Sequence, residues 1–375
     1  MKRMFVALFL LLFCSICASA SEPAITTKKI SDNFYVFYGG GGLGANAGMS
    51  IGEDGVLLVD VMKDTTAPML YAEIRKITDK PVKYVINTHG DFDHAGGNNF
   101  FKEKGAVIIG QSNAHYSSAK SDIKIGNAFT LEFNGETIAA KHVEAHSFND
   151  MIIYFPIDNI IFTGDTFTNQ SPPYSFIDGA RGQLMAIEAA LGFSDEETTI
   201  VPGHGGIDNA SGLRAYREKF TAWIGRIKTL HDKGMTAAEM VRDAKLNEIK
   251  QRFLVINKGE EVADARFERL VARTLSSDFV DAYALPEEVR DAYPGIYRKA
   301  EGGVVEVFSE NDRLFLRQEG AFMWELAPQS LTEFKIRVLL GDSIVFNVNR
   351  DTGAVIGFEG TLHGGPISAK RIAAP

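Results

Sequence analysis

The sequence predicts an α/β fold followed by a small all-β domain. Through the first two-thirds of the chain, short β-branched runs alternate with short helical patterns, which is typical of an α/β layout. After Pro286 the helical patterns give way to short alternating segments with turn signals. The chain has 375 residues, which is enough to bury more than one ordinary core, so we expect two domains.

The strands expected in the first part are short, apolar and bounded by Gly, Pro, Asn or Asp. They are Tyr35–Tyr38, Val56–Val59, Val82–Asn87, Val107–Ile109, Thr137–His142, Met151–Phe155, Ile160–Thr163 and Thr199–Val201. Apolar residues recur at steps of three or four along Leu213–Leu230 and Asp264–Ala284, so both segments are expected to be helices. Between them, Thr236-Ala-Ala-Glu239 forms a capping box, which predicts another short helix.

The segments expected to be strands after Pro286 have the spacing of a small antiparallel barrel or sandwich. They are Gly295–Tyr297, Val304–Phe308, Leu314–Arg317, Phe334–Leu339, Ile344–Val348 and Val355–Glu359. The sequence identifies no partner for this domain.

The N-terminus is typical of a secretory signal peptide. A basic head precedes the apolar run Met4–Cys17, and an Ala-Ser-Ala sequence ends at Ala20. Because the apolar run is shorter than the roughly 20 residues that span a bilayer, we expect cleavage after Ala20 and no membrane attachment afterwards. The mature protein is then exported, to the periplasm or outside the cell. Cleavage removes both cysteines, Cys14 and Cys17, so every metal ligand must be a histidine or a carboxylate.

The charge balance argues against a nucleic-acid partner. The formal net charge is −9, and loss of Lys2 and Arg3 with the signal peptide leaves 37 basic against 48 acidic residues, a balance of −11. A negative protein repels phosphate backbones, so we expect a small-molecule substrate.

Side chains that bind metals are concentrated directly after apolar strands. Four of them fall within Asn87–Gly97, and three more each follow a later strand. They are His89, Asp91, Asp93, His94, His146, Asp165 and His204. Clustered carboxylates repel one another without a cation, and ligands at the ends of neighbouring strands can gather along one sheet edge. The pattern therefore predicts a metal centre.

Together these motifs resemble the metallo-β-lactamase superfamily over about residues 28–230. The resemblance includes the Gly-rich segment Gly39–Gly48, the strand that ends at Val59-Asp60, and the order of the ligand motifs. It implies a four-layer αβ/βα sandwich with a dinuclear metal site at one end. The implied first site is held by His89, the residue at position 91 and His146; the second is held by Asp93, His94 and His204, with Asp165 bridging both ions.

Position 91 departs from the family pattern, which has histidine where this chain has Asp91. A carboxylate is a harder, anionic ligand and favours harder ions. Three outcomes stay open: Asp91 binds zinc directly, the first site is weak or empty, or the pair of sites holds iron or manganese. Two zinc ions are the expected cofactor.

The resemblance implies hydrolysis without a covalent enzyme intermediate. Two divalent ions make a bridging hydroxide available near neutral pH and polarise the carbonyl that it attacks. Asp93 is the candidate catalytic residue, because its free oxygen would orient that water and pass a proton to the leaving group. Export favours a β-lactam or a lactone among the amides and esters that such a site cleaves, so the enzyme is expected to be a zinc hydrolase and possible β-lactamase.

With this resemblance the chain divides into four parts. They are a signal peptide at 1–20, a metallo-β-lactamase-like catalytic domain at 21–235, a helical extension or linker at 236–285, and a small antiparallel β domain at 286–375.

Several residues outside the ligand set are candidates for supporting roles. Tyr174, Phe176 and Arg181 follow Asp165 and would line a substrate pocket, or else belong to a packed loop with a solvated arginine. Asp60 and Asp150 would orient a ligand histidine or hold loop backbone, or else cap local turns. His142 is expected beside the site or on the surface, and His115, His231 and His363 are expected to be ordinary surface or packing residues.

Two other function classes stay open. The first is a diiron protein of flavodiiron type that reduces oxygen or nitric oxide, because those proteins resemble this chain in placing a carboxylate at the position of Asp91. The second is a metal-stabilised binding module without catalytic activity.

Overall fold

The structure is a computed structural model that describes residues 24–114, 121–169, 172, 177–254, 263–280, 282–318 and 323–373. The predicted signal peptide and the candidates His115, Tyr174 and Phe176 lie outside the described residues. Within the described residues, no helix has both the length and the apolar stretch needed to cross a bilayer.

The first sheet has the order β1-β2-β3-β4-β5-β6-β7, antiparallel as far as β4 and parallel from there to β7. Its strands are β1 (Thr26–Lys29), β2 (Phe34–Tyr38), β3 (Ala47–Gly52), β4 (Gly55–Val59), β5 (Val82–Ile86), β6 (Val107–Gln111) and β7 (Ile123–Ile125). Helices α1 (Ala67–Arg75), α2 (Phe92–Ala95) and α3 (Asn98–Glu103) occur in its crossover connections.

The second sheet has the order β13-β12-β11-β10-β9-β8, in which only the β11–β12 pair is parallel among the described strands. Its strands are β8 (Ala128–Phe133), β9 (Glu136–Val143), β10 (Asp150–Phe155), β11 (Ile160–Thr168), β12 (Thr199–His204) and β13 (Asp208–Asn209). The helices beside it are α4 (Gly179–Phe193), α5 (Ala210–His231), α6 (Ala237–Met240), α7 (Ala244–Leu254) and α8 (Asp264–Asp278).

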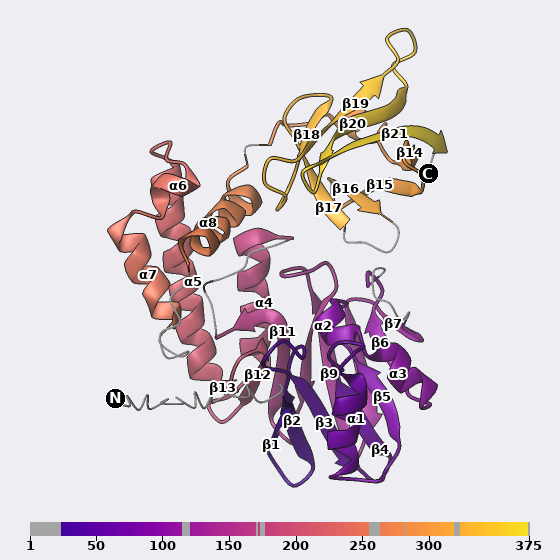
Figure 1. Cartoon of the computed structure of the whole chain (residues 1–375), viewed down its shortest axis with the longest axis vertical. Coiled ribbons are helices and arrows are strands. Elements are labelled where there is room, and N and C mark those ends of the chain that lie inside the picture. Colours follow the sequence, from indigo (N-terminus) through magenta and orange to yellow (C-terminus); the bar gives the residue numbers. More distant parts are fainter. Residues whose placement is uncertain are drawn as a thin grey trace, which may run out of the picture.

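Buried side chains define the layers of this sandwich. One cluster, with Phe34, Val59 and Phe162, joins the facing sides of the two sheets. A second packs α1 and α3 against the outer face of the first sheet, and a third packs α4, α5, α7 and α8 against the outer face of the second. Figure 1 shows the same sequence of helices, sheet, sheet and helices. The predicted four-layer αβ/βα sandwich is therefore confirmed.

The C-terminal strands form a closed antiparallel barrel, which confirms the predicted all-β domain and selects the barrel over the sandwich. Its elements are α9 (Glu287–Arg290), β14 (Gly295–Lys299), β15 (Val304–Glu310), β16 (Arg313–Gln318), β17 (Met323–Pro328), β18 (Glu333–Ile336), β19 (Ser343–Val348), β20 (Val355–Leu362) and β21 (Gly365–Ala373). The barrel closes where β14 pairs with β21. Aromatic rings that include Tyr293, Tyr297, Phe346 and Phe358 fill its interior.

Two expected elements end earlier than the sequence pattern indicates. Helix α8 ends at Asp278 rather than Ala284, because the chain turns away there and the backbone N–H of Tyr283 donates to the carbonyl of Pro328 in the barrel, at 2.7 Å. Strand β18 ends at Ile336 rather than Leu339, because Val338 has a φ of 67°, which extended pairing does not accept.

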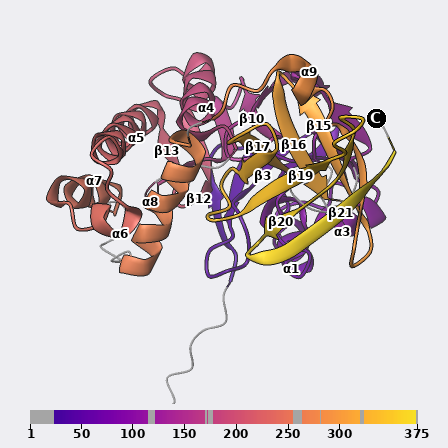
Figure 2. The same cartoon turned by 90° about the horizontal axis from the view of Figure 1, so that it is seen from above.

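The barrel lies against the sandwich, on the side of α4 and α8 (Figures 1 and 2). Phe148 and Ile177 of the sandwich pack with Phe315 and Met323 of the barrel in one buried cluster. Beside that cluster, Arg313 Nη1 of β16 lies 3.4 Å from Asp178 Oδ1 and 3.7 Å from Glu144 Oε2 of the sandwich. The contact therefore combines apolar packing with ion pairs.

Candidate metal centre

The predicted ligands converge from four separate segments on one edge of the sandwich, residues 89–94 and the segments of His146, Asp165 and His204. His89 follows β5, and Asp91, Asp93 and His94 lie on or just before the short helix α2. His146 lies in the connection between β9 and β10, Asp165 within β11, and His204 at the end of β12. Each segment follows or contains an apolar strand of a buried sheet, so rigid elements position every one of these side chains.

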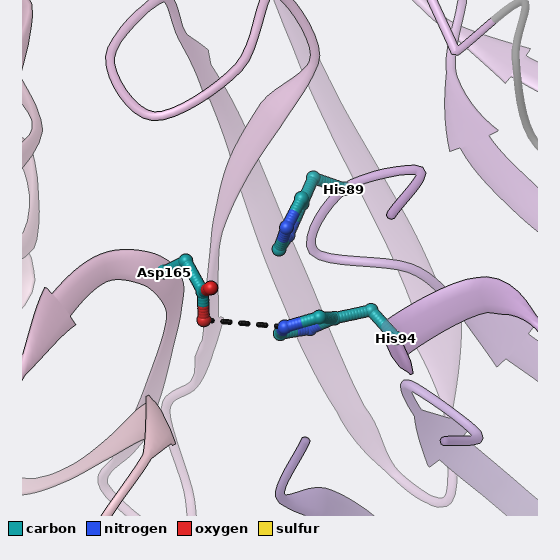
Figure 3. Close-up of side chains that lie close together, drawn as sticks. All are labelled: His89, His94 and Asp165. Atoms are coloured by element: carbon teal, nitrogen blue, oxygen red, sulfur yellow. Dashed lines mark hydrogen bonds and ion pairs between the residues drawn. The ribbon is translucent and has the colours of Figure 1, made fainter. Parts of the chain in front are cut away.

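The side chains form three overlapping groups, in each of which the potential ligand atoms all lie within 4.8 Å of one another. The groups are His89, Asp91 and His146; Asp93, His94 and His204; and His89, His94 and Asp165. The first two match the two ligand sets that the resemblance implies. Figure 3 shows Asp165 and His94 pointing toward each other with His89 alongside; Asp165 Oδ1 lies 3.2 Å from His94 Nε2.

The separations among these side chains are close to those between ligands of one metal ion. Ligand atoms about 2.0–2.2 Å from a tetrahedral zinc lie roughly 3.3–3.6 Å from one another. Here Asp91 Oδ2 lies 3.4 Å from His146 Nε2 and 3.6 Å from His89 Nε2. On the other side, His204 Nε2 lies 3.2 Å from Asp93 Oδ2 and 3.5 Å from Asp165 Oδ1.

Two polar atoms at this site have no hydrogen-bond partner among the described residues: His89 Nε2 and Asp91 Oδ1, both buried. Buried polar atoms without a partner are unfavourable unless an ion or water satisfies them. Both belong to the group that contains Asp91, so the side chains present fit a cation here despite the replacement of histidine.

Asp60 orients one of the candidate ligands. Its carboxylate is buried, accepts hydrogen bonds from the backbone N–H and the hydroxyl of Thr88 at 2.8 and 2.6 Å, and accepts one from His94 Nδ1 at 2.8 Å. The last bond directs His94 Nε2 toward Asp165. Of the two roles expected for Asp60, the geometry favours orienting a ligand histidine over capping a turn.

Three further side chains hold the loop that bears His146. Asp150 accepts hydrogen bonds from the backbone N–H and the hydroxyl of Ser147, both at 2.7 Å, and His142 Nε2 donates to the carbonyl of Phe148 at 2.9 Å. Asn149 Oδ1 accepts from the backbone N–H of Gly90 at 2.8 Å, which ties this loop to the segment of His89. His142 and Asp150 therefore support the site without belonging to the ligand groups.

Glycines are required at two close approaches beside the site. A Cβ on Gly203 would lie 2.0 Å from Asp165 Oδ1, so only glycine leaves room for that carboxylate. Gly44 has a φ of 144°, and a Cβ there would lie 2.9 Å from the carbonyl oxygen of Asp93. The Gly-rich segment can therefore lie directly against the segment of Asp93.

The ionisable groups of the site shift one another strongly. Burial lowers the pKa of His146 and of His204, but hydrogen bonds to carboxylates outweigh this effect. The bond to Asp91 raises the pKa of His146 to about 9, and the bonds to Asp165 and Asp93 raise that of His204 to about 9. Burial raises the pKa of Asp91 and Asp165, but the facing histidines outweigh it and hold both well below the ordinary range. Without metal, His146 and His204 form imidazolium–carboxylate pairs, so a metal that binds these two histidines must displace protons.

The metal centre lies between two hollows. One, of about 560 Å³, is lined by the glycine segment that starts at Gly39, by Lys63 and Phe92, and by Asp93 and His204. The other, of about 240 Å³, borders Asp91 and His146 and extends between the sandwich and the barrel.

The predicted substrate residue Arg181 is not among the residues that line either hollow. It lies on the exposed side of α4, with an ion pair to Asp178. A role in substrate binding stays a prediction for Arg181, as it does for Tyr174 and Phe176. Sequence reasoning missed the barrel side chains at the smaller hollow, including Trp324 and His363, because the barrel segment contains no motif that points to a site in the other domain.

Comparisons with known proteins find similarity to the metallo-beta-lactamase superfamily. Residues 40–204 match the family described as the metallo-beta-lactamase superfamily. The hydroxyacylglutathione hydrolase of Pelagibacter ubique is 31% identical over 157 residues, which are 40% of this chain and 64% of that protein. The metallo-beta-lactamase IND-1 of Chryseobacterium indologenes is 25% identical over 195 residues, 49% of this chain and 81% of that protein.

Among solved structures, the sec-alkylsulfatase Pisa1 of Pseudomonas sp. is similar with a TM-score of 0.55 and 17% identity, over 72% of this chain and 54% of that one. At this identity the likeness shows the fold alone. The chain covers 48–64% of the length of four hydroxyacylglutathione hydrolases that it matches.

Proposed function

The αβ/βα sandwich of this chain belongs to the metallo-beta-lactamase superfamily, and we propose from this premise that the protein is a dinuclear zinc hydrolase of a carbonyl amide or ester. The superfamily is hydrolytic and metal-dependent. The observation that supports the proposal is the spacing of the ligand atoms: Asp91 Oδ2 lies 3.4 Å from His146 Nε2, as a ligand in the place of histidine should.

In this proposal His89, Asp91 and His146 hold one ion, Asp93, His94 and His204 hold the other, and Asp165 lies between the two sets. When bound, two such ions supply a hydroxide near neutral pH and polarise the carbonyl group. Asp93 faces the larger hollow, so its carboxylate can hold a proton and deliver it to the leaving group there. Asp60 keeps His94 in one tautomer, and the Ser147–Asp150 turn holds His146 in place.

The substrate we propose is a β-lactam or a lactone. The named relatives act on two kinds of substrate, hydroxyacylglutathione and β-lactams, and both contain a carbonyl group that water can attack. The acidic balance of the chain disfavours nucleic acid. We also propose export with cleavage after Ala20, for which mass spectrometry of the mature protein should give Ser21 as the first residue.

The decisive experiment is metal analysis of the purified protein and of its Asp91→His variant, each assayed on β-lactams, lactones, esters, thioesters and phosphodiesters. We expect two equivalents of zinc and hydrolysis of a carbonyl substrate by the wild type. Asp91→Asn serves as the matched control, because it keeps the size of the side chain and removes its charge. One equivalent of metal that is unchanged by both substitutions would show that Asp91 is not a ligand.

The carboxylate at position 91 also favours a second candidate, a diiron centre of flavodiiron type, because carboxylates suit harder ions. Bound iron with visible absorbance, together with oxygen consumption and no hydrolysis, would support this candidate over the zinc hydrolase. Metal without either activity would instead leave the binding module as the function.

A further inference from the structure

The smaller hollow beside the metal centre is shared between the two domains. Its sandwich side contains Asp91 and His146 together with Ser147, Phe148 and Ile177. Its other side comes from the barrel and from α8: Arg273, Met323, Trp324, Val338, Leu339 and His363. The candidate ligands of the first metal therefore open onto a space that the sandwich alone does not enclose.

The topology of the barrel explains why distant residues meet here. In an up-and-down barrel, every second connection lies at the same end. Met323 and Trp324 begin β17, Val338 and Leu339 lie between β18 and β19, and His363 lies between β20 and β21. All of these positions belong to one end of the barrel, so the barrel presents that end to the metal centre.

This end of the barrel is shaped by strained backbone. Val338 has a φ of 67° and His363 a φ of 54°, in the left-handed region that side chains seldom adopt. For a β-branched residue such as Val338 this conformation is unfavourable and persists only where the surrounding structure imposes it, most often at functional sites. The His363 ring also packs edge-on against Trp324, with 5.1 Å between the ring centroids, which fixes both side chains at the hollow.

The barrel is held in this position by ion pairs as well as by packing. Arg313 lies among Glu325, Asp178 and Glu144, of which the last two belong to the sandwich. Nearby, Arg337 donates from Nη1 to the carbonyl of Ser277 in α8 at 2.6 Å. These contacts join the barrel to the sandwich and to α8.

We propose that this hollow binds the acyl side of the substrate and that the barrel thereby selects substrates with a bulky apolar acyl group. The proposal rests on the proposed hydrolase function. The lining is mainly apolar, and Phe148 and Trp324 offer aromatic surface to a ring. A cavity of about 150 Å³ accepts benzene, so the observed 240 Å³ suits a phenyl ring with a short alkyl linker.

The kinetic test compares 4-nitrophenyl 4-phenylbutanoate with 4-nitrophenyl acetate. Burial of the phenyl ring should make kcat/KM for the longer ester roughly 10–100-fold higher in the wild type. Leu339→Trp fills the hollow and should reduce the ratio of the two kcat/KM values to near one. Leu340→Trp is the matched control, because Leu340 lies next to it in the same connection, is 50% exposed and does not line the hollow.

A binding test separates this proposal from the hydrolase function. Calorimetry with 4-phenylbutanol, which cannot be hydrolysed, should show binding to the wild type and to Leu340→Trp, and at least tenfold weaker binding to Leu339→Trp. If this pattern holds but no ester, amide or thioester is hydrolysed, the hydrolase function fails and the hollow stands as an apolar site. If hydrolysis occurs with no preference for the longer ester and Leu339→Trp binds the alcohol as the wild type does, the acyl site is overturned and the hydrolase stands.

Discussion

Replacement of Asp60 by Asn should weaken metal binding without moving the backbone. Asp60 has a φ of 56°, a left-handed conformation that Asn also tolerates, so the substitution changes only the chemistry of the side chain. One carboxylate oxygen accepts from Thr88 N, and the other accepts from both the Thr88 hydroxyl and His94 Nδ1. In the variant, the amide oxygen accepts from the Thr88 backbone N–H, so the amide NH₂ group faces His94 Nδ1. That ring nitrogen donates to Asp60 in the wild type and therefore needs an acceptor, which the NH₂ group is not.

The size of the effect follows from these bonds. A hydrogen bond to a charged group contributes about 1.5–3 kcal/mol, and the Thr88 hydroxyl can rotate to accept from the new amide. The hydrogen bond that is lost is therefore mainly the one from His94 Nδ1, and without it the His94 ring is no longer held toward Asp165. We expect metal affinity to decrease roughly 10–100-fold, the range found when a partner of a ligand histidine is removed.

The assay is competition for zinc between the protein and a chromophoric chelator. Asp54→Asn is the matched control, because Asp54 is exposed, accepts from the backbone N–H of Asn134 at 2.7 Å, and belongs to none of the candidate ligand groups. Zinc affinity that is equal in Asp60→Asn, Asp54→Asn and the wild type would refute the orienting role of Asp60.

Three further outcomes are expected. Gly203→Ala places a Cβ 2.0 Å from Asp165 Oδ1 and should displace that carboxylate, so we expect kcat to decrease about 100-fold and the amount of bound metal to fall. Unchanged kcat and unchanged metal content would contradict the close approach of Gly203 to Asp165. Arg313→Met leaves Glu325, Asp178 and Glu144 without their shared cation and should lower the free energy of unfolding by about 2–4 kcal/mol. In calorimetry the barrel should then melt as a separate transition, and a single transition at the wild-type temperature would contradict a stabilising role for this contact. Burial raises the pKa of Tyr297 to about 12, so as the pH rises the unfolded chain loses this proton before the folded protein does. The free energy of unfolding should therefore fall between about pH 10 and 12, by up to about 1.4 kcal/mol per pH unit. Denaturant unfolding of Tyr297→Phe should show a shallower decline with pH, and the same decline in both proteins would contradict this prediction.

The strands that the sequence pattern predicts are those with strong apolar runs, such as β4 and β5. It did not predict β3, with the sequence AGMSIG, because small residues hide its alternation. Strand β8, with the sequence AFTLEF, was missed although its apolar and polar residues alternate. Strand β17 was also missed, although it supplies Met323 and Trp324 to the hollow. Helix α7 lies within the segment expected to be a helical extension or linker, but its bounds were not predicted; it packs with α5 and α8 against the second sheet.

The types of the candidate ligands, their order and their placement after apolar strands can be read from the sequence, because short motifs at strand ends depend on local chemistry. It also determined that position 91 provides a carboxylate. The folded structure was needed to show that Asp91 Oδ2 lies 3.6 Å from His89 Nε2 and 3.4 Å from His146 Nε2, and that one end of the barrel lines the hollow beside them. Such distances depend on how two sheets and a separate domain pack, which is a property of long-range contacts and is not encoded in any single motif.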